Sequence, residues 1–447
     1  MKICKDVFKK YDIRGLYKEE ITDELAFLIG KAFAKMAKTT VRVGYDSRTS
    51  SENLRDNLIK GLVESGINVI DIGLVTTPML YYAREYLKEP FAIMITASHL
   101  SNKYNGFKLC DEDGNMFDNK INDLLNIILN NDFIDGLGSI KQFSIANDYS
   151  NMILEKIKLG PKKLKVVVDC GNGTTSTINP QIISDLGCDV IPLYCELNPL
   201  FPNHIPDPSI STNMLALSKK VLEENADLGI AFDSDGDRIG VVDENGKYIK
   251  SDILMIMIWK SIARICKNKI AAFDVTCSNS LKDYLTKLHL KPVFAKCGHS
   301  YMKNYLKLND CDFAGESSGH FYFNDEFYGY DDALYAAGRI LRILSYSDYS
   351  ISKYFNDVPS YYSTDTKYID FNINNYDYII EKIFNYAKSK GYECITIDGI
   401  RICFSHGFAL VRKSNTTNSL CLRFEGDSLE LLESYRLEIM KLINEEL

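Results

Sequence analysis

Leu228-Gly-Ile-Ala-Phe-Asp-Ser-Asp-Gly-Asp-Arg238 joins an apolar run of strand length to a loop that carries three carboxylates. Residues Leu228–Phe232 predict a buried strand, because a short apolar run that ends in a polar, glycine-containing loop is typical of parallel sheets. Other apolar runs of strand length occur along the chain. Two stretches that lie between such runs, Glu52–Ser65 and Leu281–Leu288, have helical periodicity. The runs themselves are Val41–Asp46, Ile67–Gly73, Phe91–Thr96, Lys165–Asp169, Cys188–Tyr194, Ile270–Val275, Pro292–Ala295 and Asp312–Ala314. This alternation predicts parallel sheets with helices packed on their faces.

The alternation passes through three segments of roughly 100 residues each, which predicts three similar α/β domains. The pattern changes from about Val358, where Tyr361–Ile373 alternates polar and apolar residues and Tyr378–Lys388 is helical. Strands are expected at Cys394–Ile397, Arg401–Phe404 and Leu420–Phe424, and a last helix over Ser428–Glu445. We therefore expect an α/β protein with three similar domains, each on a mixed or parallel sheet, followed by a smaller α+β domain. The expected domains are 1–145, 146–247, 248–357 and 358–447.

Composition narrows the class of protein. Of the 447 residues, 46% are hydrophobic and 25% charged, which is typical of a soluble globular protein. The net charge of −8 argues against a nucleic-acid binder but permits a small anionic substrate. The twelve cysteines are scattered without a CxxC pair, and the opening MKICKDVFKKYDIRG has no apolar signal-peptide core. No apolar run approaches the ~20 residues of a membrane span. We expect a reduced, cytoplasmic protein without nucleic-acid or membrane partners.

Three polar clusters follow strands of the expected sheets. Thr96–His99 follows one strand, Asp233–Arg238 a second, and Gly315–His320 a third. Ligands of parallel α/β sheets bind beyond the carboxyl ends of the strands. The common placement predicts that the three clusters belong to one site.

Asp233, Asp235 and Asp237 point to a metal ion. Three carboxylates in five residues repel one another unless a cation neutralises them, and hard oxygen ligands favour Mg²⁺ or Ca²⁺ over zinc. A calcium loop of the EF-hand kind is one alternative, with Glu244 at its twelfth position. However, Arg238 stands where that loop needs glycine, and a strand precedes it where a helix should. A solvated acidic turn is the other alternative.

Ser98 lies where a strand gives way to a loop, beside His99. The chain has no G-x-S-x-G elbow there, which argues against a hydrolase triad. A serine that carries phosphate needs a cation and basic groups instead, and Mg²⁺ on the Asp loop together with Lys108 could supply them. A plain turn residue is the alternative.

Two further loops suit a sugar and a phosphate. Glu316 and Ser318 offer groups that hydrogen-bond sugar hydroxyls, although the same composition also fits an ordinary polar turn. Arg412-Lys-Ser-Asn-Thr-Thr417 combines a guanidinium with hydroxyls and backbone N–H groups, which suits a phosphate. A plain basic loop is the alternative for that segment.

Together these segments resemble the α-D-phosphohexomutases, most closely the bacterial phosphomannomutase/phosphoglucomutase group, across nearly the whole chain. The matching segments stand in the family's order: Phe8-Lys-Lys-Tyr-Asp-Ile-Arg-Gly15, Thr96–His99 with Tyr104–Lys108, Asp169–Gly173, Phe201–Asp207, Asp233–Arg238, Lys296–Ser300, Gly315–His320, and Arg412–Thr417 with Leu422–Glu425. The resemblance implies four domains around a central cleft.

The resemblance also implies roles for single residues. Ser98 would be the phosphoserine and would share a Mg²⁺ ion with Asp233, Asp235 and Asp237. Arg14, Lys108 and His320 would assist proton and phosphoryl transfer. The sugar would be held by Tyr11, Arg238, His299, Glu316 and Ser318. The non-reacting phosphate would be held by Arg412, Ser414, Asn415 and Thr416.

The implied activity is the interconversion of hexose 1-phosphate and hexose 6-phosphate, of mannose and/or glucose. It would run through a hexose 1,6-bisphosphate, which is both intermediate and activator, in a monomer or weak homo-oligomer. Alternatives are a phosphoglucosamine mutase, an aspartyl-phosphate phosphatase and a non-catalytic sugar-phosphate sensor. The chain departs from the family pattern at Leu100-Ser101, where Asn-Pro is usual, at Thr276, where Lys is common, and at Ser234, where Gly is frequent.

Overall fold

The computed structural model describes residues 3–370, 376–414 and 419–444. The chain divides into two compact units, each of which is described by itself. Unit 1 comprises Met1–Ser251 and Ser318–Tyr354, and unit 2 comprises Asp252–Ser317 and Phe355–Leu447. Among the described helices, none combines the length and the apolar character that crossing a bilayer requires.

The first sheet of unit 1 has the order β1-β5-β4-β2-β3-β7, with β6 paired to β5. Strands β4, β2, β3 and β7 run parallel, whereas β5 is antiparallel to both β4 and β1. The strands are β1 (Ile13–Leu16), β2 (Val41–Tyr45), β3 (Val69–Leu74), β4 (Ala92–Ile95), β5 (Tyr104–Asp111), β6 (Gly114–Asn115) and β7 (Ile140–Gln142).

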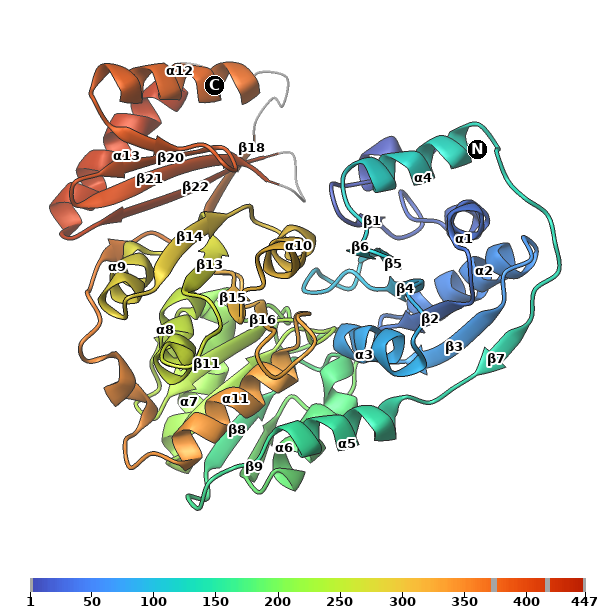
Figure 1. Cartoon of the computed structure of the whole chain (residues 1–447), viewed down its shortest axis with the longest axis horizontal. Helices are drawn as coiled ribbons and strands as arrows, with labels where there is room; N and C mark the ends of the chain where they lie inside the picture. Colours follow the sequence, from blue (N-terminus) through green and yellow to red (C-terminus); the bar gives the residue numbers. More distant parts are fainter. Residues whose placement is uncertain (1–2, 371–375, 415–418, 445–447) are drawn as a thin grey trace. The chain divides into compact units, whose positions relative to one another are not determined.

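Helices cover both faces of this sheet (Figure 1). Helices α1, α2 and α4 share one apolar core with the strands, and α3 packs on the other face. A Cβ atom on Gly30 of α1 would lie 2.2 Å from the carbonyl oxygen of Leu58 in α2, so glycine allows the close crossing of these two helices. The helices are η1 (Lys5–Val7), α1 (Asp23–Met36), α2 (Ser51–Val63), α3 (Thr77–Leu87), α4 (Asn119–Leu129) and α5 (Ala146–Lys156).

The second sheet of unit 1 has the order β12-β11-β10-β8-β9. Strands β10, β8 and β9 are parallel, while β11 returns antiparallel to β10. Its strands are β8 (Lys165–Asp169), β9 (Asp189–Leu193), β10 (Leu228–Phe232), β11 (Ile239–Asp243) and β12 (Tyr248–Ile249). The other elements are η2 (Thr174–Thr177), α6 (Asn179–Asp185), η3 (Ser211–Met214), α7 (Leu215–Glu224), β16 (Phe321–Phe323) and α11 (Ala333–Ser345).

Unit 2 begins with the parallel strands β14-β13-β15 and their helices. Trp259 of α8 is fully buried and meets Phe313 of β15 edge-on, with ring centroids 5.3 Å apart. The elements are α8 (Ser251–Ile262), β13 (Ile270–Asp274), α9 (Asn279–Lys287), β14 (Lys291–Ala295), α10 (His299–Asn309) and β15 (Phe313–Gly315). The short helix η4 (Ile351–Phe355) spans the boundary at which the chain returns from unit 1 to unit 2.

The last sheet is antiparallel, in the order β17-β22-β21-β20-β19, with β18 paired to β22. Helices α12 and α13 share an apolar core with one face of this sheet (Figure 1). Phe408 of β21 belongs to a separate, smaller apolar cluster, in which it packs with Val275. The elements are β17 (Tyr362–Ser363), β18 (Lys367–Asp370), α12 (Tyr376–Ser389), β19 (Glu393–Ile395), β20 (Ile400–Phe404), β21 (Gly407–Lys413), β22 (Ser419–Gly426) and α13 (Leu429–Asn444).

The expected fold class is confirmed: three α/β segments precede a smaller α+β domain. The two sheets of unit 1 are mixed because β4 continues into β5 and β10 into β11 through connections too short for a helical crossover. The loops that carry Ser98 and the three aspartates are these two connections.

Asp332, which caps the start of α11, gives this fold a testable pH dependence. One carboxylate oxygen accepts from the backbone N–H of Tyr335 and the other from the hydroxyl of Tyr149, each at 2.8 Å. Burial raises the pKa of Asp332 to about 7, although both donors lower it. The folded state therefore binds a proton more tightly than the unfolded chain does, and the resulting stability is present below the unfolded pKa and lost as pH rises through 7.

We expect Asp332→Asn to remove this pH dependence, because asparagine keeps the cap without a charge. Between pH 4 and pH 8, the free energy of unfolding of the unmodified protein should fall by about 2 to 4 kcal/mol relative to that of the variant. Denaturant unfolding at a series of pH values measures this difference. A difference that stays constant across that range contradicts the prediction.

Candidate active site

The loops after β4 and β10 meet in unit 1. The Ser98 hydroxyl donates a hydrogen bond to Asp233 Oδ2 at 2.8 Å, across 135 residues of sequence. Ser98 is 2% exposed and Asp233 is fully buried. The structure therefore brings together two of the three clusters that the strand-end pattern assigned to one site, and His320 of the third cluster lies against Asp237.

The three aspartates form a compact buried group. Asp233, Asp235 and Asp237 are each 0% exposed, and one oxygen of each lies within 4.8 Å of the others. Asp233 Oδ1 accepts from the backbone N–H groups of Gly236, Asp237 and Arg238, each at 3.0 Å. Gly236 has a φ of +81°, a conformation that favours glycine, so the loop can wrap around that oxygen.

Lys108 on β5 is the cation of this group. Its ammonium donates to Asp235 Oδ2 at 2.7 Å and also contacts Asp237 Oδ2. Burial alone would lower the pKa of Lys108, but the two carboxylates outweigh it and raise the pKa above its usual value. Conversely, Lys108 lowers the pKa of Asp235 and of Asp237 against the effect of their burial.

The residues fit a hard divalent cation. Burial, together with Asp237 and Asp235, raises the pKa of Asp233 well above its usual value, so a further cation would stabilise the ionised form of this buried group. Asp235 Oδ1 is buried and accepts no hydrogen bond from the described residues, so it is available as a ligand. An all-oxygen donor set suits Mg²⁺ better than zinc.

Histidines flank the aspartates on both sides. His320 Nε2 lies 3.3 Å from Asp237 Oδ1, and its Nδ1 lies 2.9 Å from the hydroxyl of Ser318. Arg238 approaches the same ring, with its Nε 3.4 Å from His320 Nε2. His99 Nδ1 lies 3.3 Å from Ser98 Oγ, and burial together with Arg238 and Arg14 lowers the pKa of His99 well below its usual value.

Arg14 is fixed on the neighbouring strand. It lies opposite Gly106 in the β1–β5 register, two residues before Lys108 on β5. Asp12 holds its guanidinium at 2.6 Å, and both side chains are buried. Tyr11 precedes this pair in the chain and is half-buried.

Unit 2 contains the remaining expected site residues. Glu316 is 3% exposed, and its Oε1 accepts from the backbone N–H of Gly298 at 2.5 Å, next to His299 at the start of α10. Arg412 is 6% exposed and donates from Nε to Asp398 Oδ2 at 2.9 Å, and Ser414 is also buried. The expected phosphate ligands Asn415 and Thr416 lie outside the described residues.

The sequence did not point to Thr77 or Asp331. The Thr77 hydroxyl donates to Asp235 Oδ2 at 2.6 Å, and its N–H donates to the carbonyl of Asp235 at 2.8 Å. Asp331 is fully buried and offers an oxygen within 4.8 Å of ligand atoms of Asp237 and His320. Thr77-Pro78 at the start of α3 and the Asp331-Asp332 pair before α11 were available signals, since both patterns are typical of helix starts.

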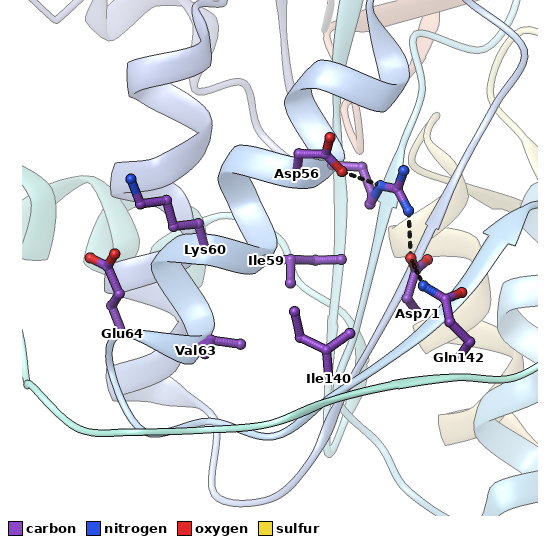
Figure 2. Close-up of a pocket in the computed structure, with 9 residues that line it drawn as sticks. Asp56, Ile59, Lys60, Val63, Glu64, Asp71, Ile140 and Gln142 are labelled. Carbon is purple, nitrogen blue, oxygen red and sulfur yellow. Dashed lines mark hydrogen bonds and ion pairs between the residues drawn. The ribbon is translucent and has the colours of Figure 1, made fainter.

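A separate pocket of about 430 Å³ lies between α2, β3 and β7 (Figure 2). Its buried carboxylate, Asp71, accepts from Arg55 at 2.5 Å and from Gln142 at 2.8 Å. The lining residues are Arg55, Asp56, Ile59, Lys60, Val63, Glu64, Asp71, Ile140 and Gln142. None of the residues expected at the active site lines this pocket.

Four successive domain models of one family match the chain. Their descriptions are phosphoglucomutase/phosphomannomutase alpha/beta/alpha domain I for residues 5–135, domain II for 147–246, domain III for 250–362, and the C-terminal domain for 376–442.

Relatives extend over almost the whole chain. A phosphomannomutase/phosphoglucomutase of Pseudomonas aeruginosa is 41% identical over 431 residues, which are 96% of this chain and 93% of that protein. A phosphoglucomutase of Neisseria meningitidis is 36% identical over 443 residues, with 96% and 95% covered. The crystal structure of a Burkholderia thailandensis phosphoglucomutase/phosphomannomutase family protein superposes with a TM-score of 0.90 at 33% identity, covering 99% of this chain and 98% of that one. Because all four domain models match in order and full-length relatives share more than a third of their residues, this chain belongs to the phosphoglucomutase/phosphomannomutase family.

Proposed function

We propose that this protein is a phosphohexomutase that interconverts hexose 1-phosphate and hexose 6-phosphate, of glucose and/or mannose, with Ser98 as the phosphoryl carrier. The observation that carries the proposal is the Ser98 hydroxyl, 2.8 Å from Asp233, beside a buried group of three carboxylates and Lys108. A serine hydroxyl that contacts a carboxylate of the candidate metal site directly suits reversible phosphoryl transfer better than acyl transfer.

Mg²⁺ is the proposed metal, held by Asp233, Asp235, Asp237 and an oxygen on Ser98. When bound, it would neutralise charge that develops on the transferred phosphoryl group. Lys108 and Arg14 supply fixed positive charge on neighbouring strands, where it can hold phosphoryl oxygens. Since Lys108 is anchored by two carboxylates, its position costs little reorganisation during the reaction.

The proposed reaction consists of two phosphoryl transfers, the second of which restores the phosphorylated Ser98. In the first, the bond between phosphorus and Ser98 Oγ breaks, a bond from phosphorus to the free hydroxyl of the hexose phosphate forms, and that hydroxyl loses its proton. The resulting hexose 1,6-bisphosphate reorients and returns its other phosphoryl group to Ser98 by the reverse chemistry. His320, which lies against Asp237 and Ser318, is the proposed group that takes and returns the proton.

Substrate binding is proposed for the other expected residues. Tyr11, Arg238, His299, Glu316 and Ser318 would contact the sugar, and Arg412, Ser414, Asn415 and Thr416 the non-reacting phosphate. Glu316 supports this role because its carboxylate is buried and held by the backbone N–H of Gly298, beside His299 at the start of α10. Arg412 supports it because Asp398 fixes its guanidinium near the end of strand β21.

Coupled assays of glucose 6-phosphate and mannose 6-phosphate formation from the matching 1-phosphates test the proposal. We expect turnover of at least one sugar, dependent on Mg²⁺ and stimulated by a trace of the matching hexose 1,6-bisphosphate. The names of the relatives favour glucose and mannose over glucosamine phosphate, so glucosamine 1-phosphate serves as the comparison substrate. Absence of turnover with both glucose and mannose 1-phosphate contradicts the proposal.

A further inference from the structure

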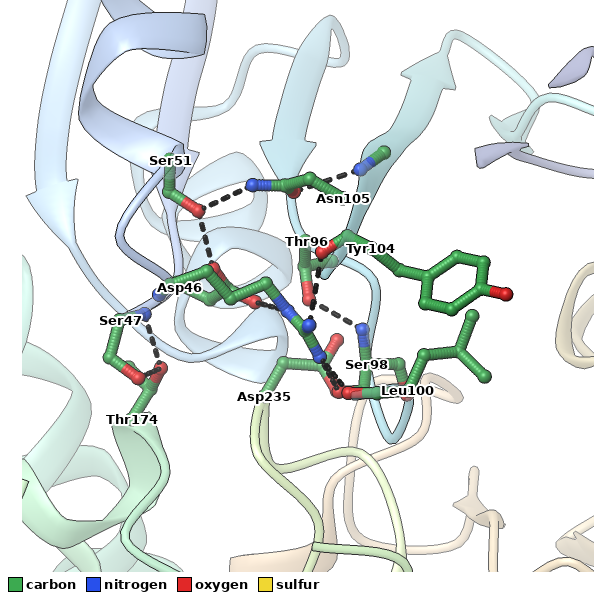
Figure 3. Close-up of polar contacts among 12 residues, drawn as sticks. Asp46, Ser47, Ser51, Thr96, Ser98, Leu100, Tyr104, Asn105, Thr174 and Asp235 are labelled. Carbon is green, nitrogen blue, oxygen red and sulfur yellow. Dashed lines mark hydrogen bonds and ion pairs between the residues drawn. The ribbon is translucent and has the colours of Figure 1, made fainter. Parts of the chain in front are cut away.

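One side chain, Arg48, binds the backbone of the loop that carries Ser98. Arg48 lies three residues after β2 and is 2% exposed. Its Nη2 donates to the carbonyl oxygens of Ser98 and Leu100, both at 2.6 Å. Its Nη1 donates to those of Ser101 at 2.6 Å and Tyr104 at 3.0 Å. One guanidinium thus binds four carbonyl groups of a seven-residue segment. Figure 3 shows three of the residues that it binds, Ser98, Leu100 and Tyr104.

Asp46 fixes the orientation of this guanidinium. Asp46 Oδ2 accepts from Arg48 Nε at 3.0 Å, and its Oδ1 accepts from the Arg48 backbone N–H at 3.1 Å. The hydroxyl of Ser51 donates to the same Oδ1 at 2.6 Å, and Asn105 donates to Ser51 at 2.9 Å (Figure 3). All five N–H bonds of the guanidinium are therefore used, one on Asp46 and four on the loop.

The loop needs such support because Ser98 has an unfavourable backbone conformation. Its φ is +49°, in the left-handed region, which costs a non-glycine residue about 1 to 3 kcal/mol. Local bonds within the turn are few: Ser98 N–H donates to Thr96 Oγ1 at 2.8 Å, and Leu100 N–H to the carbonyl of Ala97 at 3.1 Å. Buried carbonyl groups that lost Arg48 would seek other donors, and the turn would relax.

We propose that Arg48, oriented by Asp46, is a positioning residue that holds the Ser98 hydroxyl against Asp233 for phosphoryl transfer. This inference rests on the proposed function of Ser98. It also gives Leu100 and Ser101, where the chain departs from the family pattern, a place in this arrangement, because Arg48 binds the carbonyl groups of both residues. Since every N–H of the guanidinium is used within the protein, Arg48 acts on the rate of transfer and not on the binding of the sugar phosphate.

The test compares Arg48→Lys with the unmodified protein in the coupled assay. Lysine keeps the charge but cannot span four carbonyl groups, so kcat should fall about 100-fold, as expected for a misplaced reacting group. KM for the hexose 1-phosphate should stay within about threefold. Transfer of labelled phosphate from phosphorylated Ser98 to substrate, measured in a single turnover, should slow by the same factor as kcat.

Arg84→Lys is the matched control. Arg84 also donates to two backbone carbonyl groups near the same sheet, that of Pro90 before β4 at 2.6 Å and that of Asp111 at the end of β5 at 2.8 Å, and neither belongs to the Ser98 loop. The control variant should lower the melting temperature by a comparable amount and leave kcat unchanged. This separates positioning from a general loss of stability.

Asp46→Asn is the second variant and decides the matter if Arg48→Lys does not fold. It weakens the anchor of the guanidinium but keeps its loop contacts, so kcat should fall about tenfold with KM unchanged. A folded variant whose kcat stays within threefold of that of the unmodified protein, or whose KM rises as much as kcat falls, overturns the inference about Arg48. Either result leaves the proposed function of the protein unaffected. An unmodified protein without turnover of either sugar phosphate overturns the proposed function, and the inference falls with it.

Discussion

Replacing Ser98 with alanine should lower kcat for the preferred hexose 1-phosphate by at least about 10⁴-fold, the scale on which enzymes lose activity when a covalent nucleophile is removed. Alanine has no oxygen to carry the phosphoryl group, so neither half of the proposed reaction can proceed. Stability should change little, because the hydroxyl makes a single strong contact, the bond to Asp233. The coupled assay, with added hexose 1,6-bisphosphate, measures the loss.

Ser65→Ala is the control for this variant. Ser65 is a similarly buried serine of the same unit that follows α2, away from the loops after β4 and β10. It should keep full activity. Mass spectrometry should locate acid-stable phosphate on Ser98 of the unmodified protein and find none on Ser98→Ala. Phosphate on Asp233 or Asp235, or turnover by the alanine variant, would instead favour the aspartyl-phosphate alternative.

The strands that the sequence predicted best are the ones buried on both faces. Lys165–Asp169 and Leu228–Phe232 match β8 and β10 residue for residue, because a short apolar run bounded by polar residues is typical of a buried strand of a parallel sheet. Tyr104–Asp111 was not predicted as a strand, since its mixture of polar and apolar residues was interpreted only as part of a motif. That omission hid the antiparallel strand that places Lys108 beside the aspartates.

The sequence predicted those parts of the candidate active site that lie in loops at the carboxyl ends of parallel strands. Ser98 and Asp233 each follow a central strand, so their meeting was predictable from the strand-end rule alone. Arg48 and Thr77 were not, because their contacts depend on how connections fold back across the sheet. Thr77 and Asp235 are 158 residues apart in sequence, and Arg48 and Ser98 are 50 apart. No local periodicity encodes such pairs.

Replacing Asp235 with asparagine should abolish metal-dependent stabilisation and lower kcat at least about 10³-fold. The change removes both a proposed metal ligand and one of the two carboxylates that hold Lys108. In the unmodified protein, a cation at 100 times its dissociation constant should add about 2.7 kcal/mol to the free energy of unfolding. The variant should lose this increment because Asp235 Oδ1, the buried oxygen that accepts no hydrogen bond from the described residues, becomes part of a neutral amide.

Thermal unfolding with and without Mg²⁺, after treatment of the protein with a chelator, measures the increment directly. Asp71→Asn is the control, because Asp71 is equally buried in unit 1 but is paired with Arg55 and Gln142 (Figure 2). It should keep both the Mg²⁺-dependent rise in melting temperature and the activity. A Mg²⁺ response in Asp235→Asn as large as that of the unmodified protein would place the cation elsewhere. Loss of the response in Asp235→Asn but not in Asp71→Asn would instead show that the metal binds at the loop after β10. Asp233 of that loop accepts the hydrogen bond of the Ser98 hydroxyl, so the metal would lie close to the serine.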